Sequence, residues 1–366
     1  MIRFEGVSKV YPDGTRAVEG LDLEIEEGSF TVLVGPSGCG KTTSMRMINR
    51  MVAPSSGRVL VNGRDVAGIR PVSLRLGIGY VLQNAGLFPH RTVADNVAAV
   101  LRLKGDSRRT GRTKALAAME RVGLEAALAE RYPAQLSGGQ IQRVGVARAL
   151  AADPPILLMD EPFSAVDPIV RDGLQRQMLD LQAQLGKTIV MVTHDIDEAL
   201  LLGDRIAVMA PGGVLAQHAD ARTVLTRPAD EFVASLVAKD RGFRALSFAP
   251  LAGIDPVPLP AAGSDGAIDL GTLAPGWSLE LEHAGASGER RGSWRAPDGT
   301  ALRVTGSVSR ADTLRKALDA VLASPHGLAL VLDPGVPPAV VNLALLTPLL
   351  TPSPGVATGG VSGGRP

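Results

Sequence analysis

The sequence predicts an α/β fold built on a mainly parallel β-sheet, with a small antiparallel β layer at its start. Four short apolar runs have the length and composition of buried strands; they cover residues 29–34, 156–159, 188–192 and 205–209. Helical spacing over residues 113–122 and 169–185, between these runs, favours parallel strands joined by helices. Residues 2–7 and 21–25 alternate apolar and polar side chains, which is typical of antiparallel strands with one exposed face.

Composition and charge are those of an ordinary globular chain. Of the 366 residues, 45% are hydrophobic and 20% are charged, and 38 basic against 37 acidic residues leave a net charge of +1. This balance excludes a protein held to nucleic acid by charge and a protein with an acidic tail. A single cysteine excludes an internal disulfide. No apolar run approaches the roughly 20 residues that cross a bilayer, so we expect a soluble chain without a secretion signal.

Glycine and proline divide the chain into two parts. They account for 32 of residues 241–366 but for only 36 of residues 1–240. The length also fits two domains. We therefore predict a first domain over residues 1–240, a linker over 241–260, a small α+β domain over 261–350 and a disordered tail over 351–366. Within the small domain, residues 279–283 and 328–332 predict strands and residues 311–322 predict a helix.

A glycine-rich segment follows the first predicted buried strand. It consists of Gly35, Pro36, Ser37, Gly38, Cys39, Gly40, Lys41, Thr42 and Thr43, and matches G-x-x-x-x-G-K-[ST]. A predicted helix through residues 45–49 follows it, so backbone N–H groups and the helix N-terminus surround one point that favours phosphate. Lys41 suits the β- and γ-phosphates of a nucleotide, and the Thr42 hydroxyl suits Mg²⁺. The alternative is a glycine-rich turn that binds no ligand. Cys39 is expected to be a small filler of the loop; the alternative is a thiol made reactive by Lys41 and the helix N-terminus, whose alkylation would block the site.

Two acidic residues follow the apolar run 156–159. Because parallel strands end at one edge of a sheet, Asp160 and Glu161 are expected beside the glycine-rich segment. Asp160 would then hold Mg²⁺, and Glu161 would polarise an attacking water. The alternative is a solvated acidic turn.

A second glycine-containing turn precedes the predicted helix over residues 141–150. It consists of Leu136, Ser137, Gly138, Gly139 and Gln140. Ser137 is a good N-cap residue for that helix. The same residues also fit a second anion site, because exposed glycine N–H groups at a helix N-terminus bind phosphate. From these residues alone, both interpretations stay open.

Taken together, these motifs make residues 1–240 resemble the ATP-binding subunit of an ABC transporter, a P-loop NTPase with an antiparallel β layer and a helical signature subdomain. The resemblance implies that two such subunits pair head to tail. Each ATP then lies between the phosphate loop of one subunit and residues 136–140, the signature, of the other. It also implies Mg²⁺ as cofactor.

The resemblance implies roles for single residues. The catalytic residues would be Glu161, His194 and Lys41, with His194 contacting the γ-phosphate. Tyr11 would stack on adenine, and Asp167 would lie in the loop that crosses the dimer. Gln83 would touch Mg²⁺ and transmit motion to the membrane subunit. The Mg²⁺ ligands would be Thr42, Gln83 and Asp160.

Finer segments resemble the importers of quaternary-amine osmoprotectants, such as glycine betaine, choline, carnitine or proline. These segments are residues 49–57, 83–90, 193–199 and 240–244. The resemblance implies a peripheral subunit on the cytoplasmic face of the membrane. Its partners would be integral permease subunits and an extracytoplasmic substrate-binding protein, and nucleic acid would not be one. The alternatives are an importer of another cargo (polyamine, sulfate or methionine) and a soluble ABC ATPase outside transport.

The last part of the chain resembles the family less closely. Several members of the subgroup end in paired CBS domains that regulate transport, and residues 304–350 look like one such unit. Residues 255–300 lack the pattern. A degenerate CBS pair and a small β-rich appendage are both compatible with this sequence.

Overall fold

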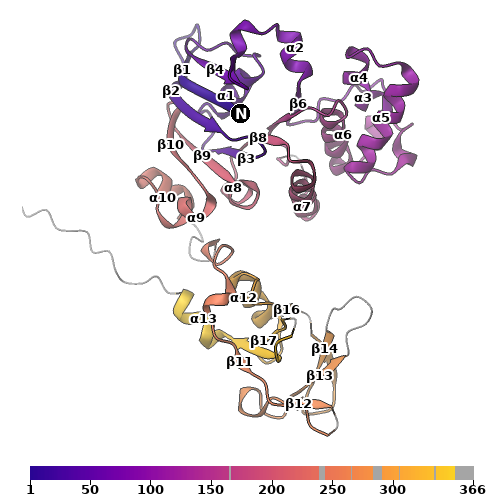
Figure 1. Cartoon of the computed structure of the whole chain (residues 1–366), viewed down its shortest axis with the longest axis vertical. Coiled ribbons are helices and arrows are strands. Elements are labelled where there is room, and N and C mark those ends of the chain that lie inside the picture. Colours follow the sequence, from indigo (N-terminus) through magenta and orange to yellow (C-terminus); the bar gives the residue numbers. More distant parts are fainter. Residues whose placement is uncertain are drawn as a thin grey trace, which may run out of the picture. The chain divides into compact units, whose positions relative to one another are not determined.

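The computed structural model describes residues 1–164, 166–238, 244–264, 266–282, 291–304, 306–333 and 335–350. The chain divides into two compact units (Figure 1), unit 1 over residues 1–239 and unit 2 over residues 240–366. The predicted tail and most of residues 240–244 lie outside the described residues.

The core of unit 1 is a six-stranded sheet with the order β10-β9-β3-β8-β7-β6. Its strands are β3 (Phe30–Val34), β6 (Ile78–Val81), β7 (Ile156–Asp160), β8 (Thr188–Thr193), β9 (Arg205–Ala210) and β10 (Val214–Ala219). All neighbours are parallel except β9 and β10. All four predicted apolar runs therefore form strands of a mainly parallel sheet. The carboxyl ends of β3, β7 and β8 lie at one edge of it.

A second sheet forms the predicted antiparallel layer. It has the order β2-β1-β4-β5 and consists of β1 (Ile2–Val10), β2 (Arg16–Ile25), β4 (Ser56–Val61) and β5 (Arg64–Asp65). Helix α1 (Lys41–Ile48) buries Met45, Met47 and Ile48 in a core shared with both sheets. In Figure 1, α1 lies beside β1, β2 and β4. The two sheets thus fix the direction of the helix that follows the phosphate loop.

The remaining helices of unit 1 form two sets. One set stands apart in Figure 1 and contains α3 (Val93–Val97), α4 (Ala99–Leu103), α5 (Arg108–Arg121) and α6 (Gly138–Leu150). The other helices are α2 (Pro71–Leu76), α7 (Pro168–Leu185), α8 (Ile196–Leu202), α9 (Ala221–Thr226) and α10 (Glu231–Val237), and short 3₁₀ turns span Val66–Gly68, Ala126–Leu128 and Pro133–Gln135. None of the helices in the described ranges is long and apolar enough to cross a membrane.

A buried amide organises the loop between β6 and α3. Asn96 in α3 is fully buried, and its Oδ1 accepts the backbone N–H of Phe88 at 2.7 Å. Its Nδ2 donates to three carbonyls of the same loop, those of Phe88, Arg91 and Thr92, at 3.0–3.1 Å. Asn96 therefore fixes the segment that follows Gln83.

Unit 2 contains two four-stranded sheets. The first, of order β11-β18-β17-β16, consists of β11 (Val257–Pro258), β16 (Ser307–Val308), β17 (Leu328–Val331) and β18 (Ala339–Asn342), and α12 (Leu314–Ala323) and α13 (Leu343–Leu350) accompany it. The second is an antiparallel meander of β12 (Ala267–Asp269), β13 (Ser278–Glu282), β14 (Arg291–Arg295) and β15 (Ala301–Arg303). Short 3₁₀ turns span Leu251–Gly253 and Gly271–Leu273. The predicted helix begins at Leu314 because Thr313 caps it.

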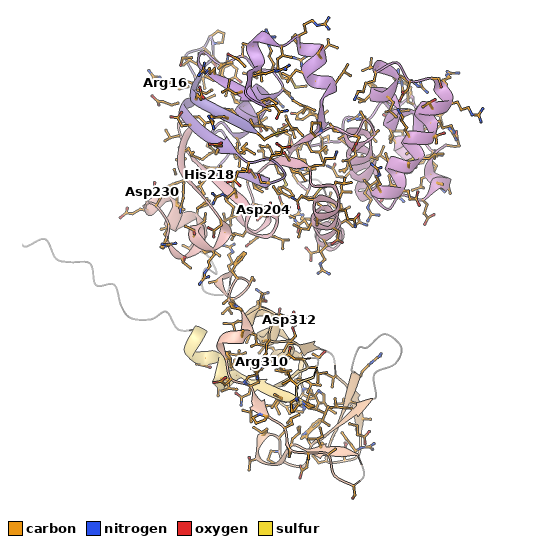
Figure 2. All side chains as sticks on the ribbon, viewed as in Figure 1. Arg16, Asp204, His218, Asp230, Arg310 and Asp312 are labelled. Atoms are coloured by element: carbon orange, nitrogen blue, oxygen red, sulfur yellow. The ribbon has the colours of Figure 1, made fainter. Side chains whose placement is uncertain are left out.

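The turn between β16 and α12 is closed by charged side chains. Asp312 accepts the backbone N–H of Ser309 at 2.8 Å and pairs with Lys316, also at 2.8 Å (Figure 2). The backbone N–H of Arg310 donates to Asp333 at 3.1 Å. This turn therefore connects the end of β17 to the start of α12.

The predicted linker over residues 241–260 is wrong for its described part. Leu251 and Ile254 are buried in the core of unit 2, and β11 pairs with β18. The clustered prolines suggested a linker, but β11 is an edge strand, where a proline needs no hydrogen-bonding partner for its nitrogen. The described residues of this segment therefore belong to unit 2.

Three aromatic rings join the two sheets of unit 2. The imidazole of His326, before β17, meets Trp277 edge to face at 5.0 Å and Trp294 of β14 at 4.5 Å between ring centroids. Its Nε2 is buried and has no hydrogen-bond partner among the residues that the structure describes. Burial lowers the pKa of His326 from its ordinary value of 6.5. The neutral ring is therefore the form that the fold favours.

We expect N96A to lower the free energy of unfolding of unit 1 by about 2 kcal/mol, because it removes the partner of the Phe88 N–H and of the Arg91 carbonyl and one hydrogen bond each from the carbonyls of Phe88 and Thr92. Chemical denaturation followed by circular dichroism measures the loss. The exposed Asn84 provides a matched control as N84A, which should stay within about 0.5 kcal/mol of the wild-type value. Equal stability of N96A and N84A would contradict the structural role of Asn96.

We expect unit 2 to lose stability as the pH falls below 6.5. The folded state binds a proton on His326 less readily than the unfolded state, so this contribution to stability is present above pH 6.5 and is lost below it. Both tryptophans of the chain contact His326, so tryptophan fluorescence reports the thermal unfolding of unit 2 alone. The melting temperature should fall between pH 7.5 and 5.5. H326F, which keeps an aromatic ring and does not titrate, should reduce that fall, and an unchanged fall would disprove the assignment.

Candidate nucleotide-binding site

Two glycines bring the glycine-rich segment against the neighbouring backbone. Gly35 and Gly40 have φ angles of 153° and 88°, in the region that favours glycine. A Cβ at Gly35 would overlap the carbonyl of Met209, and a Cβ at Gly40 would overlap the carbonyl of Ala17. The segment can follow this path only with glycine at both positions. We call residues 35–43 the phosphate loop.

The ammonium of Lys41 lies inside the phosphate loop. Its Nζ donates to the carbonyls of Gly35 and Pro36, at 2.7 Å each, and lies 3.6 Å from the Sγ of Cys39. Lys41 is 5% exposed and Cys39 is 1% exposed. The positive charge is therefore held at the centre of the loop. The alternative of a reactive Cys39 thiol is opposed by its burial, because a reagent must open the loop to reach it.

Helix α1, whose first turn completes the phosphate loop, has no capping side chain at its N-terminus. Gly40 is the N-cap of α1, with no side-chain hydrogen bond to the first turn. The first-turn N–H groups at Thr42 and Thr43 are therefore not occupied by a cap, and the helix dipole adds a favourable field for an anion. Lysine, glycine N–H groups and an uncapped helix N-terminus together fit a phosphate group.

Asp160 is the centre of one group of polar contacts beside the loop. Its Oδ1 accepts the Thr42 hydroxyl at 2.9 Å. Its Oδ2 accepts Tyr80 OH at 3.2 Å and Arg46 Nη2 at 3.4 Å. Burial raises the pKa of the Tyr80 phenol, so this group donates as a neutral hydroxyl. The predicted pair of Thr42 and Asp160 is therefore in contact.

Sequence reasoning missed Arg46 and Tyr80. Arg46 lies one helical turn after Thr42, a spacing that puts both side chains on one face of α1. That spacing was the available signal for Arg46. Tyr80 reaches Asp160 because β6 pairs with β7, and no local pattern announces this pairing.

Glu161 is the centre of a second group of contacts. Its Oε2 lies 3.2 Å from Gln83 Nε2 and 3.3 Å from His194 Nδ1. Gln83 Nε2 also lies 3.4 Å from the Ser164 hydroxyl. Three predicted residues from loops far apart in the sequence thus meet at the end of β7. The three residues predicted to bind Mg²⁺ are therefore divided between two groups of contacts. Gln83 contacts Glu161, whereas Thr42 and Asp160 contact each other.

The backbone at Glu161 is strained. Its φ of 46° places a non-glycine residue in the left-handed region, which costs about 1–3 kcal/mol. The backbone N–H of Glu161 donates to Val192 at 3.0 Å, and the Ser164 hydroxyl donates to the Glu161 carbonyl at 3.0 Å. These bonds hold the turn that carries the carboxylate between Gln83 and His194.

Tyr11 lies beside the first turn of α1. Its hydroxyl is 3.3 Å from Thr43 Oγ1, and Lys9 Nζ lies 5.2 Å from the centre of its ring. The side chain is partly exposed. An aromatic ring therefore adjoins the phosphate loop, and stacking of Tyr11 on adenine stays a prediction.

Residues 136–140 form the start of α6. Ser137 Oγ accepts the N–H of Gln140 at 3.3 Å, and Gln140 Oε1 accepts the N–H of Ser137 at 2.9 Å, which makes a capping box. Among the residues that the structure describes, none of their hydrogen bonds or ion pairs reaches the phosphate loop. Asp167 directly precedes α7. It is not among the residues described above that contact Glu161.

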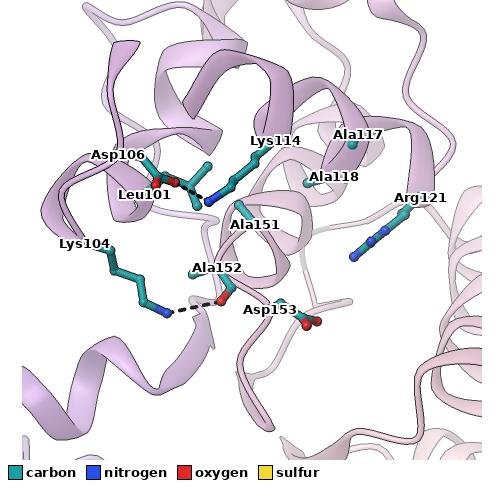
Figure 3. A pocket seen from close by; sticks show the side chains of 10 residues that line it. All are labelled: Leu101, Lys104, Asp106, Lys114, Ala117, Ala118, Arg121, Ala151, Ala152 and Asp153. Atoms are coloured by element: carbon teal, nitrogen blue, oxygen red, sulfur yellow. Dashed lines mark hydrogen bonds and ion pairs between the residues drawn. The ribbon is translucent and has the colours of Figure 1, made fainter. Parts of the chain in front are cut away.

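A cavity of about 450 Å³ lies among α4, α5 and the end of α6 (Figure 3). Lys114 pairs with Asp106 at 2.7 Å, and Lys104 donates to the carbonyl of Ala152 at 3.2 Å. Asp153 pairs with Lys187 at 2.8 Å. These charges are satisfied within the protein, and the cavity contains none of the predicted site residues.

Comparisons with known proteins agree with this geometry. The family "ABC transporter" matches residues 18–164. The chain is 49% identical over 251 residues to the osmoprotectant import ATP-binding protein OsmV of Salmonella typhimurium, covering 67% of this chain and 65% of that protein. It is 48% identical over 253 residues to the glycine betaine uptake system ATP-binding protein YehX of Escherichia coli, covering 69% and 82%.

A third relative is the glycine betaine/carnitine/choline transport ATP-binding protein OpuCA of Bacillus subtilis, 49% identical over 243 residues, with 66% of this chain and 63% of that protein covered. The matched part of the chain thus spans less than two thirds of the length of OsmV and OpuCA.

Solved structures give the same result. The dimeric post-hydrolysis state of the ATP-binding cassette MJ0796, bound to ADP and Pi, aligns with a TM-score of 0.56 and 34% identity, over 60% of this chain and 99% of that one. The cbiO1 protein of Clostridium perfringens, part of a transporter complex, aligns with a TM-score of 0.57 and 30% identity, over 65% and 94%. With its phosphate loop, its sheet order and these relatives, the chain belongs to the ABC transporter family, as an ATP-binding cassette.

Proposed function

We propose that this chain is the ATP-hydrolysing subunit of an ABC importer for quaternary-amine osmoprotectants such as glycine betaine, choline, carnitine or proline. The observation that carries the catalytic part is the contact of Glu161 with both Gln83 and His194, beside the phosphate loop. The cargo is supported by the names of the relatives, which are described as osmoprotectant, glycine betaine, carnitine and choline ATP-binding proteins.

ATP binds through the phosphate loop in this proposal. Lys41 neutralises the β- and γ-phosphates, and the N–H groups of the loop and of the first turn of α1 surround them. Tyr11 stacks on the adenine. This role is supported by the position of the Tyr11 ring beside Thr43.

Mg²⁺ fits the donors that are available. A hydroxyl, a carboxylate and a side-chain amide carbonyl are hard oxygen ligands, and Mg²⁺ usually takes one or two carboxylates together with substrate phosphates. We assign Thr42, Asp160 and Gln83 to it, with support from the 2.9 Å contact of Thr42 with Asp160. When bound, the ion supplies charge neutralisation at the phosphates.

Glu161 acts as the general base of hydrolysis. Its carboxylate accepts a proton from the attacking water, and His194 orients the γ-phosphate. Both groups are already within 3.3 Å of each other, so little rearrangement is needed to align them. Lys41 balances the charge that develops on the phosphate oxygens.

Two copies of the chain pair head to tail in this proposal. Residues 136–140 bind the ATP held by the partner's phosphate loop, and Asp167 lies in the loop that crosses the dimer. This is supported by the start of α6, which has no contact with the phosphate loop of its own chain in the described part. The dimeric cassette MJ0796 bound to ADP and Pi is a precedent.

The remaining partners follow from the importer assignment. Gln83 transmits the motion to integral permease subunits, and an extracytoplasmic binding protein supplies the cargo. The chain then lies peripherally on the cytoplasmic face of the membrane, and no nucleic acid takes part. Import of polyamine, sulfate or methionine remains the alternative, with a non-transport ABC ATPase after it.

Unit 2 is proposed as a regulatory domain with one CBS-like half. This is supported by the order β16-α12-β17-β18 in residues 307–342, which α13 follows. The antiparallel meander of β12 to β15 takes the place of the second CBS half. The meander is also compatible with the alternative of a small β-rich appendage. The proposed domains are thus the cassette over residues 1–240 and the small domain over 261–350, extended by the described part of 241–260.

We expect E161Q to lower the ATPase rate by about 10²-fold or more, because it removes the base while it keeps the shape of the side chain. The ATP-bound dimer should accumulate. Phosphate release and size-exclusion chromatography with ATP measure the two effects. The exposed Glu125 provides the control E125Q, which should hydrolyse ATP at the wild-type rate. Rapid turnover by E161Q would refute the role of Glu161.

We expect K41A to abolish uptake of labelled glycine betaine or choline when it is expressed with the rest of its operon in a strain lacking other uptake systems. The variant loses the charge that balances the phosphates. Parallel assays with labelled spermidine, sulfate and methionine separate the alternative cargos. Lys41-dependent uptake of one of these, without uptake of a quaternary amine, would replace the proposed cargo.

A further inference from the structure

A buried carboxylate lies four residues after His194 and has no part in the catalysis proposed above. Glu198 is in the first turn of α8 and is 5% exposed. In the described part of the chain it has no ion pair within 4 Å. A buried carboxylate without a cation is costly unless hydrogen bonds hold it in place.

Two neutral donors hold this carboxylate. The Thr193 hydroxyl donates to Glu198 Oε2 at 2.7 Å, and Gln175 Nε2 of α7 donates to Oε1 at 3.4 Å. Thr193 Oγ1 also accepts the N–H of Asp195 at 3.0 Å, which leaves its own proton for Glu198. Thr193 and Asp195 are the two neighbours of His194 in the chain. Glu198 therefore holds both sides of the turn that carries His194.

Arg171 extends this network of contacts to the loop of Asp167. Arg171 of α7 donates to the carbonyl of Val166 at 3.2 Å and lies 4.0 Å from Asp195. Asp195 caps α8 by accepting the N–H groups of Asp197 and Glu198. The turn of His194 is thus connected to α7 by Gln175 and to the residue Val166 before α7 by Arg171.

Burial raises the pKa of Glu198 from its ordinary value of 4.5. The charge of Asp195 raises it further, whereas the hydrogen bond from Thr193 and the charges of Arg171 and His194 lower it. Strand β3 and helix α9 also pack on α8; β3 presents no titratable side chain, and the one on α9 is the exposed Arg222. When Glu198 takes up a proton, the carboxyl group loses its charge and one of its oxygens becomes a donor, which weakens the hydrogen bonds that it accepts.

We propose that Glu198 is a positioning residue for ATP hydrolysis, whose buried carboxylate fixes the turn that presents His194 to Glu161 and joins that turn to α7. This inference rests on the proposed function. The residue acts through Thr193 and does not touch the substrate. It should therefore affect the rate of hydrolysis more than the binding of ATP.

The test combines E198Q, T193V and the double variant. E198Q keeps the size of the side chain and removes the charge, and the Gln175 amide can turn round to pair with it. T193V removes the donating hydroxyl and keeps the shape. Each variant should lower kcat about tenfold and change KM for ATP less than twofold. The double variant should lose no more than T193V alone, because E198Q weakens and T193V removes the same hydrogen bond between Thr193 and residue 198.

The pH profile gives a second measurement. In the wild type, kcat should fall on the acid side as Glu198 is protonated, and E198Q should lose that component of the fall. D197N removes a charge from the neighbouring exposed position of α8 and should keep the wild-type kcat and pH profile. A lowered kcat in D197N equal to that of E198Q would overturn the proposal, and so would additive losses in the double variant.

Two failures are distinguishable in this design. Absence of ATP hydrolysis by the folded wild-type chain would contradict the proposed function itself. Wild-type hydrolysis together with an unchanged kcat and pH profile in E198Q would contradict only the role of Glu198. Thermal unfolding of E198Q, compared with that of D197N, verifies that both variants are folded.

Discussion

The nucleotide site depends on how closely two sheets approach each other around the phosphate loop. The carbonyl of Ala17, in the antiparallel sheet, lies where a Cβ of Gly40 or of Gly213 would stand, and Gly35 lies in the same way against Met209 of the parallel sheet. Only glycine allows this approach. Helix α1 is then packed in a core shared by both sheets, so its N-terminus and Lys41 have one direction. The other site residues come from strand ends of the parallel sheet, and their positions follow from its register.

The strands of the parallel sheet and the phosphate loop could be predicted because their signals are local. Buried apolar runs predict strands whatever their partners, and the loop needs glycines at a short fixed spacing. The contacts of Asp160 with Tyr80, and of Glu161 with Gln83, depend on the pairing of β6 with β7, which the sequence of either strand does not specify. The described part of the predicted linker failed for a related reason. A proline-rich segment forms a strand when it lies at the edge of a sheet, and only its partner β18 reveals this. The packing of His326 with two tryptophans was likewise invisible, since the rings come from distant positions.

The site combines a strained turn with a buried network that supports it. Glu161 takes a left-handed backbone conformation at a cost of about 1–3 kcal/mol, and the hydrogen bonds of its backbone to Val192 and Ser164 offset that cost. In helix α8, which follows the neighbouring strand β8, Glu198 is buried at the cost of desolvation and is held by Thr193 and Gln175. Both the strained backbone of Glu161 and the buried carboxylate of Glu198 cost stability, so stability alone does not account for them. Their common result is that the carboxylate of Glu161 and the imidazole of His194 face each other across 3.3 Å.

The proposed dimer follows from how the hydrogen bonds of residues 136–140 are distributed. The Ser137 hydroxyl and the Gln140 side chain are used within the capping box, so neither is directed at the chain's own phosphate loop. What the turn still offers is backbone N–H groups of glycine at the positive end of a thirteen-residue helix, which favour an anion. No hydrogen bond or ion pair among the described residues joins this turn to Lys41 of the same chain. In the proposed arrangement, the anion at this turn is the ATP held by the partner. The phosphate loop and residues 136–140 are each an incomplete site on one chain, and pairing two chains makes two complete sites.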